Sequence, residues 1–178
     1  VADLDKDGRM DLVFGNQGTN TFYKASNEHP MKLWINDFDD NGTIEQITTC
    51  NYDDKDYPIL MKKELTGQMV KLKKQNLKAS EYASKSIDEL FSKEVVDKSI
   101  VKKLNITESV IAMNNGNGKF TIKKLPSRVQ FSCVCGIICE DINKDGNLDL
   151  IMAGNNFEFK PQFSRLDSSY GSILINDG

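Results

Sequence analysis

The stretch D-L-D-K-D-G-R-M-D-L at residues 3–12 returns as D-I-N-K-D-G-N-L-D-L at residues 141–150. The two stretches align position by position, from Asp3 with Asp141 to Leu12 with Leu150, without an insertion or a deletion. The likeness continues into the apolar runs that follow, and both runs end in a Gly-Asn pair. Self-similarity at a fixed spacing indicates an internal structural repeat.

Both stretches place oxygen-bearing side chains at alternate positions of a nine-residue loop. A hard cation such as Ca²⁺ takes about six to eight oxygen ligands, and a glycine at position 6 permits the turn that gathers them. Position 7 is expected to contribute its backbone carbonyl. The candidate ligands of the first loop are Asp3, Asp5, Asp7, Arg9 and Asp11. Those of the third loop are Asp141, Asn143, Asp145, Asn147 and Asp149.

A second acidic loop lies between these two, at residues 37–45. It keeps the frame, with a glycine at position 6, an amide at position 5 and a glutamate at position 9. Its candidate ligands are Asp37, Asp39, Asn41, Thr43 and Glu45. Because it coincides with an Asn-Asp turn after an apolar run, we interpret it as a hairpin turn first and a metal site second.

A simple turn and an EF-hand are the two alternatives to such cation sites. Clusters of Asp, Asn and Gly make simple turns, which accounts for the composition but not for the alternate spacing. Carboxylates confined to nine residues repel one another unless a cation neutralises them. An EF-hand requires a glutamate at position 12 between two helices. Position 12 is Phe14, Thr48 and Met152 in the three loops.

The segments around the loops predict strands. Residues 9–14 and 147–152 are short apolar runs, and residues 131–139 are rich in β-branched, aromatic and cysteine side chains. A second shared element, an apolar run followed by an Asn/Gly turn, occurs at residues 33–37, 110–118 and 174–177. The expected fold class is therefore mainly β.

Residues 58–104 have a different character, with many Lys, Glu, Leu, Ala and Ser residues. Apolar residues there recur at three- and four-residue steps, which predicts short helices. Ser86 opens the capping-box sequence S-I-D-E, and Ser80 is a candidate cap for another helix. The predicted division is a repeat with two calcium loops at 1–57, an α-helical insertion at 58–104, and a repeat with one calcium loop at 105–178.

The segments A-D-L-D-K-D-G-R-M-D-L-V-F-G-N (residues 2–16) and E-D-I-N-K-D-G-N-L-D-L-I-M-A-G-N (residues 140–155) resemble the FG-GAP or VCBS repeat of integrin-like β-propellers. Residues 33–178 further resemble VCBS proteins of environmental and Bacteroidetes-type bacteria. The resemblance implies antiparallel four-stranded propeller blades, Ca²⁺ in loops between strands, export to the cell surface, and adhesion or binding of carbohydrate or protein. The helical insertion and the length depart from a regular propeller, so partial or open blades are expected. Open blade edges would favour self-association.

Composition narrows the choice of partners. The formal net charge is -3 and no Lys/Arg-rich arm is present, so nucleic acid is not an expected partner. No apolar run approaches the ~18 residues of a membrane span. The chain begins and stops inside motifs, so we expect an extracellular segment of a longer protein whose signal peptide lies outside it.

The four cysteines are expected to be buried as small hydrophobes, without disulfides or zinc.

These patterns predict a calcium-binding extracellular module with a binding, adhesion or structural role and no enzymatic activity. The alternative is the propeller domain of a secreted polysaccharide hydrolase or lyase, for which Glu158 and Asp167 are available carboxylates. The only histidine, His29, lies in a turn-like segment. Residues 157–170, with their aromatic side chains and Arg165, form a candidate surface for an unknown protein or carbohydrate ligand.

Overall fold

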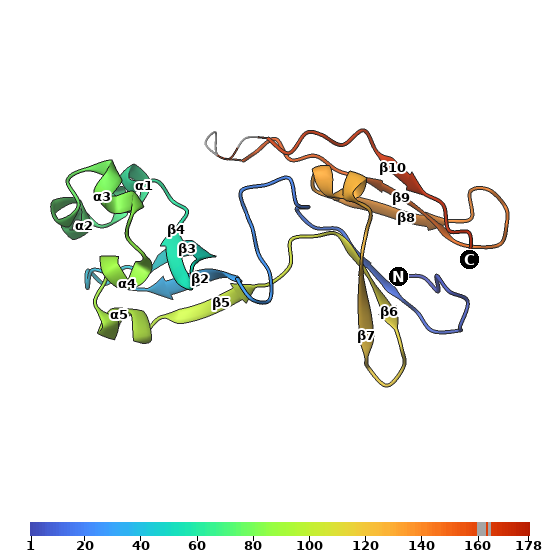
Figure 1. Cartoon of the computed structure of the whole chain (residues 1–178), viewed down its shortest axis with the longest axis horizontal. Helices are drawn as coiled ribbons and strands as arrows, with labels where there is room; N and C mark the ends of the chain where they lie inside the picture. The colour runs from blue at the N-terminus through green and yellow to red at the C-terminus, as the bar shows by residue number, and fades with distance from the viewer. Residues whose placement is uncertain (160–162, 164) are drawn as a thin grey trace. The chain divides into compact units, whose positions relative to one another are not determined.

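The structure is a computed structural model that describes residues 1–159, 163 and 165–178 (Figure 1). Strands account for 30% of the chain and helices for 19%, which confirms the predicted mainly β class. The strands form three antiparallel sheets, and none of these three sheets closes into a barrel.

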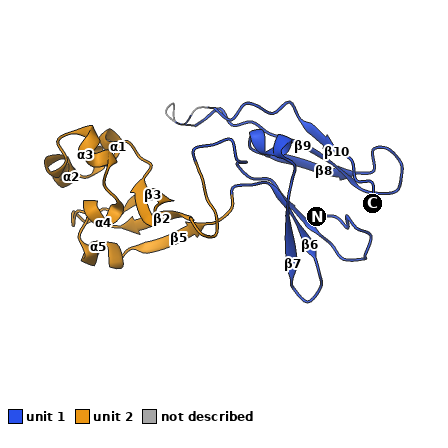
Figure 2. Cartoon of the chain, viewed as in Figure 1, with its two compact units in different colours: residues 1–22, 107–178 blue, residues 23–106 orange. Residues whose placement is uncertain are grey.

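The chain divides into two compact units (Figure 2). Unit 1 contains residues 1–22 and 107–178, and unit 2 contains residues 23–106. These units differ from the predicted division at 57/58 and 104/105. It placed the first and second acidic loops in one repeat, whereas they belong to different units.

Unit 2 combines one four-stranded sheet, in the order β4-β3-β2-β5, with five short helices. Its strands are β2 (Met31–Asn36), β3 (Glu45–Tyr52), β4 (Lys55–Pro58) and β5 (Ile100–Leu104). Its helices are α1 (Lys62–Gln68), α2 (Val70–Gln75), α3 (Ala79–Ala83), α4 (Ile87–Leu90) and α5 (Lys93–Asp97). Trp34 and Ile47 of the sheet share a buried core with Leu65 and Met69 near the first helices. Because helices and sheet bury the same apolar side chains, residues 23–57 fold with the helices.

The helical prediction for residues 58–104 is confirmed in its interior. The Glu89 carboxylate accepts hydrogen bonds from the backbone N–H and Oγ of Ser86, at 2.8 and 3.0 Å, and so starts α4 as predicted. Ser80 does not cap a helix, because α3 begins after Lys78, whose N–H donates to Glu81. The last residues of the interval form β5, which pairs with β2.

Unit 1 holds two three-stranded sheets. The first has the order β1-β6-β7, formed by Leu12–Phe14, Val110–Asn114 and Phe120–Lys124. The second has the order β10-β9-β8, formed by Ser172–Leu174, Asp149–Ala153 and Gly136–Glu140. A 3₁₀ helix, η1 (Ser127–Phe131), follows β7. The four-stranded units expected from the resemblance thus match the sheet of unit 2 but not the two sheets of unit 1.

The sequence repeat is preserved in the strand register of unit 1. Leu12 of β1 pairs with Ala112 of β6, and Leu150 of β9 pairs with Leu174 of β10. Leu12 and Leu150 already correspond in the aligned loop sequences, so their partners Ala112 and Leu174 correspond as well. Along the chain, residues 154–171 connect β9 to β10, whereas the connection from β1 to β6 contains the whole of unit 2. Unit 2 is thus an insertion inside the first repeat.

The two sheets of unit 1 pack through opposite faces. Val13 and Ile111 of the first sheet lie against the core that contains Leu150 and Met152 of the second. The counterpart of Val13 is Ile151, which alternates with Leu150 and Met152 and so points to the other face. The sheets therefore follow one another as successive members of a stack. Two sheets related by a twofold axis would bury the same face of each.

Gly15 and Gly154 occupy corresponding places in the two repeats, and they allow the backbone of residues 133–135 to pass close to both. A Cβ on Gly15 would lie 2.3 Å from the Val134 carbonyl oxygen, and a Cβ on Gly154 would lie 2.5 Å from that of Cys133. The Val134 N–H donates to the Asn16 carbonyl, and the Cys135 N–H donates to that of Ala153, at 2.9 and 3.0 Å. The backbone of residues 133–135 therefore depends on the absence of both side chains.

The cysteine prediction is confirmed in part. All four are free thiols, but only Cys50 and Cys133 are buried. Cys135 is exposed, and its Sγ lies 3.5 Å from that of Cys133. The expected burial of every cysteine is therefore wrong, because the chain at Cys135 lies at the surface.

We expect Gly154→Ala to lower the free energy of unfolding by about 1–3 kcal/mol, because the new methyl group overlaps backbone that cannot swing away. Gly136→Ala is the matched control, since its Cβ would meet nothing nearer than 3.7 Å, and a change within about 0.5 kcal/mol is expected. Urea unfolding followed by far-UV circular dichroism measures both. Equal losses in the two variants would contradict the close approach.

Candidate metal centres

Each acidic loop closes between a pair of antiparallel neighbours. The residue before position 1 pairs with the residue at position 9 in all three loops, as Ala2 with Asp11, Asn36 with Glu45, and Glu140 with Asp149. The second and third loops connect β2 to β3 and β8 to β9, and the first leads into β1. The predicted strand flanks are confirmed at residues 12–14, 136–139 and 149–152. Residues 131–135, also expected to be a strand, are not one, because Phe131 ends the 3₁₀ helix η1 and the chain stays irregular up to β8. The second loop is the hairpin connection that its sequence indicated.

The three loops follow the same backbone path. Position 4 has a positive φ of 59°, 57° and 63° at Lys6, Asp40 and Lys144. The glycine at position 6 has φ of 83°, 84° and 87° in the same order. A positive φ is uncommon for a residue with a side chain, so local interactions must hold position 4 in this conformation.

The carboxylate at position 1 accepts many of the hydrogen bonds that hold the turn in this conformation. Position 1 is Asp3, Asp37 and Asp141. One of its oxygens accepts the N–H of position 5 at 3.2, 3.0 and 3.1 Å. The other accepts the N–H of position 6 at 2.9, 2.7 and 2.9 Å. Both oxygens thus satisfy backbone donors inside the turn.

The carboxylate at position 9 is the buried anchor of each loop. Asp11, Glu45 and Asp149 are 1%, 4% and 0% exposed. One oxygen accepts the N–H of position 2 at 3.0, 2.9 and 2.9 Å. In unit 1 the other oxygen reaches across the sheet and accepts the N–H of Asn114 or of Asn176, both at 2.8 Å. Sequence reasoning treated these two asparagines only as turn residues, although their recurrence after an apolar run was the available signal.

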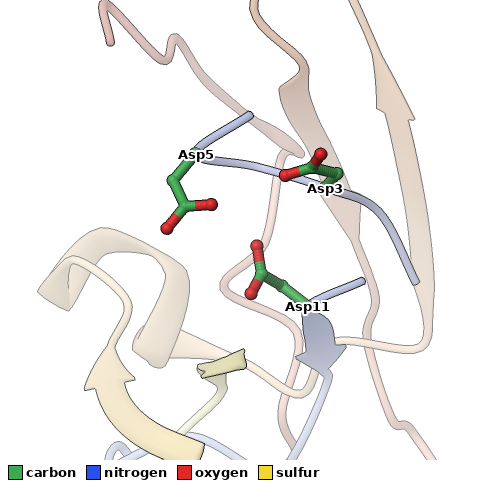
Figure 3. Close-up of side chains that lie close together, drawn as sticks. All are labelled: Asp3, Asp5 and Asp11. Atoms are coloured by element: carbon green, nitrogen blue, oxygen red, sulfur yellow. The ribbon is translucent and has the colours of Figure 1, made fainter. Parts of the chain in front are cut away.

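The carboxylates at positions 1, 3 and 9 converge. In the first loop one oxygen from each of Asp3, Asp5 and Asp11 lies within 4.8 Å of the others, and Figure 3 shows the three groups pointing toward one another. Asp37, Asp39 and Glu45 form the same arrangement in the second loop. Three like charges at such separations repel unless the groups are protonated or a cation lies among them.

The third loop has the same frame but fewer charges at its centre. Asn143 replaces a carboxylate at position 3. Its amide oxygen and a carboxylate oxygen of Asp141 accept the same N–H, that of Asp145, both at 3.1 Å. The two side-chain oxygens therefore lie beside each other, as at positions 1 and 3 of the first loop, where Asp3 and Asp5 accept the Asp7 N–H.

Position 5 is bound mainly to the loop itself. The side chains of Asp7, Asn41 and Asp145 accept the N–H of Arg9, Thr43 and Asn147 at 2.8, 2.7 and 2.7 Å. The Arg9 guanidinium also pairs with Asp7, and its Nε donates to the Asn114 carbonyl at 2.7 Å. Arg9, expected to act only through its carbonyl, thus neutralises one predicted ligand.

Hydrogen bonds lower the pKa of two of the loop carboxylates. Burial acts to raise the pKa of Asp37, but the N–H groups of Asn41 and Gly42 outweigh it and lower that pKa below its ordinary value. The N–H of Asn147 lowers the pKa of Asp145, with help from the Asn143 amide and the Lys6 charge. Ionised oxygens are the form in which carboxylates bind cations.

Asp39 provides a separate observation at position 3 of the second loop. Its Oδ1 is buried and has no hydrogen-bond partner among the described residues. A buried carboxylate oxygen without a donor is costly, and native structures rarely leave one. A cation at the centre of the loop would supply the missing interaction.

The donor set distinguishes between metals. The side-chain ligands in the three loops are carboxylate and amide oxygens, without imidazole or thiolate. Oxygen donors suit hard cations, whereas zinc sites use mainly nitrogen and sulfur. Ca²⁺ tolerates the irregular geometry of a loop better than Mg²⁺, which demands a near-ideal octahedron.

Comparison of the chain with protein-family models, with curated proteins and with solved structures finds no match. In the described part of the chain, no helix is long and apolar enough to cross a membrane. The candidate ligand surface at residues 157–170 includes residues 160–162 and 164, which lie outside the described residues. The geometry of the three loops is therefore the main guide to function.

We expect Asp149→Ala to lower the free energy of unfolding by about 2–4 kcal/mol even in the presence of a chelator. The substitution leaves the N–H groups of Ile142 and Asn176 without their acceptor, and each such loss costs about 1–3 kcal/mol when the group is buried. The control is Asp145→Ala at an exposed position, for which a loss below about 1 kcal/mol is expected. Urea titration in EDTA gives both values, and equal values would show that position 9 is not the anchor.

Proposed function

We propose that this chain is a calcium-binding extracellular module built from FG-GAP/VCBS-type repeats, with a structural and ligand-binding role. The carrying observation is that three loops in two compact units share one hydrogen-bond scheme, and that in the first and second loops the oxygens of positions 1, 3 and 9 converge on one centre. A simple turn requires the hydrogen bonds at position 1, but it does not require a convergent acid at position 3.

The residues that would hold Ca²⁺ differ in how firmly they are placed. Backbone N–H groups fix the carboxylates at positions 1 and 9, so the oxygens of these carboxylates would need little rearrangement to bind Ca²⁺. Position 3 is held less firmly, since Asp5 accepts one bond of 3.3 Å and Asp39 Oδ1 accepts none. Bound calcium would supply the positive charge that relieves the repulsion among these carboxylates. Its main effect would be to rigidify the ends of the strands that each loop joins.

The packing of unit 1 supports the propeller interpretation. Successive sheets that meet through opposite faces are the arrangement of blades and of other stacked repeats. The first loop leads into β1, which places Val13 beside the core between the sheets. The third loop leads into β9, which places Leu150 in that core. Calcium at these loops would therefore stiffen the junction between neighbouring repeats.

An extracellular location is part of this proposal, because weak calcium loops suit external calcium concentrations. Extracellular calcium modules bind with Kd of roughly 10⁻⁴ to 10⁻³ M, which only external calcium concentrations saturate. The first and second loops present three convergent carboxylates each, and the third presents two with one amide. The ligand that the module would recognise, protein or carbohydrate, belongs to this proposal and is not fixed by the loops.

We expect calorimetric titration with CaCl₂ to detect binding, and calcium at about one hundred times Kd to add about 2.7 kcal/mol of stability per site. Asp5→Asn keeps the size of the side chain but removes one of three convergent charges, so we expect about a tenfold loss of affinity at one site. The other sites should be unchanged.

The matched control is Asp54→Asn, which removes an exposed carboxylate from the turn between β3 and β4 at φ 60°, where asparagine is well tolerated. Its titration should match that of the wild type. Equal melting temperatures in calcium and in EDTA, after metal removal has been verified by elemental analysis, would overturn the proposal.

A further inference from the structure

The second sheet of unit 1 carries a row of isoleucines on its outer face. Ile138 pairs with Ile151, and Ile151 pairs with Ile173, so the three side chains lie side by side across β8, β9 and β10. Ile138 and Ile173 are 57% and 58% exposed. We call Ile138, Ile151 and Ile173 the isoleucine face. Large contiguous apolar patches on soluble proteins mark interaction sites, so this row is a candidate docking surface.

The internal repeat shows what covers such a face. Because β1 corresponds to β9 and β6 to β10, the counterparts of Ile151 and Ile173 on the first sheet are Val13 and Ile111. Val13 and Ile111 are packed against the core between the sheets. The partner of that packed face is the side of the second sheet that carries Leu150, Met152 and Leu174.

The complementary half of the same interface is open at the first sheet. The counterparts of Leu150, Met152 and Leu174 are Leu12, Phe14 and Ala112. Phe14 is 48% exposed, although its counterpart Met152 is 1% exposed. Ile122 pairs with Ala112 on the same face and is 51% exposed. Ala112 itself is buried between Leu12 and Ile122, at 3% exposed. We call Leu12, Phe14 and Ile122 the phenylalanine face.

One molecule therefore presents both halves of the interface that already joins its two repeats. We propose that a second copy of this chain docks its phenylalanine face onto the isoleucine face, head to tail, and repeats the internal packing between molecules. The interface is heterologous, because different surfaces of the two copies meet, so each dimer retains one open face of each kind.

The internal interface also has a polar contact that the docked copy can reproduce. The Nδ2 of Asn176 donates to the Leu4 carbonyl across the two repeats at 2.8 Å. The counterpart of Asn176 in the first repeat is Asn114, and the counterpart of Leu4 in the second is Ile142. Asn114 of the docked copy would thus lie near the Ile142 carbonyl, which sets the register of the interface.

Sedimentation velocity of the whole chain over about a hundredfold range of concentration tests this proposal. We expect the mean mass to rise with concentration for the wild type. Ile173→Glu and Phe14→Glu should each give a monomer, since each places a charge in one half of the interface. Val70→Glu, at a 64% exposed apolar position on α2, is the matched control and should assemble as the wild type does.

Mixing the two monomeric variants gives the sharpest readout. The Ile173→Glu chain keeps its phenylalanine face and the Phe14→Glu chain keeps its isoleucine face, so their mixture should form a one-to-one dimer and nothing larger. Circular dichroism confirms that each variant is folded. A wild type that stays monomeric, a mixture that stays monomeric, or an assembly that survives Ile173→Glu through pairing of strand edges would each overturn the proposal.

Discussion

The rest of the structure depends on a buried carboxylate at the ninth position of each loop. Asp11 and Asp149 are almost fully buried, and each accepts one N–H from its own loop and one from the end of the neighbouring strand or just beyond it. A buried carboxylate is tolerated only when its oxygens have donors, so the loop and the strand must stay together. This single group ties the turn, the start of the strand and the strand across the sheet into one unit.

That tie explains why the first repeat accepts a large insertion. Unit 2 is inserted between β1 and β6, but the register from Leu12 to Ala112 is the same as that from Leu150 to Leu174. The cost of closing a loop grows only slowly with its length. Unit 2 also buries its own core around Ile47 and Leu65, so it adds little disorder to the connection.

Opposite-face packing links the repeats to the proposed function and to the proposed assembly. Successive sheets present different surfaces to each other, so a stack of repeats that does not close into a ring leaves one face of each kind at its two ends. The acidic loops of unit 1 lie at the junctions of that stack. Rigid junctions would define the surface that the module offers to a ligand, while the open faces would define how copies meet.

The sequence by itself determined the local structure. The alternate acids and the glycine of each loop specify its path, because these interactions stay within one loop, and the S-I-D-E motif at Ser86 specifies a helix start in the same way. Only the tertiary structure decided which strands pair with which. The sequence could not show that residues 23–57 fold with the helices, or that Asn114 and Asn176 complete the anchors, because these contacts join residues far apart in the chain. Their energy comes from burying apolar surface shared between segments, and no short window of sequence contains both sides of such a contact.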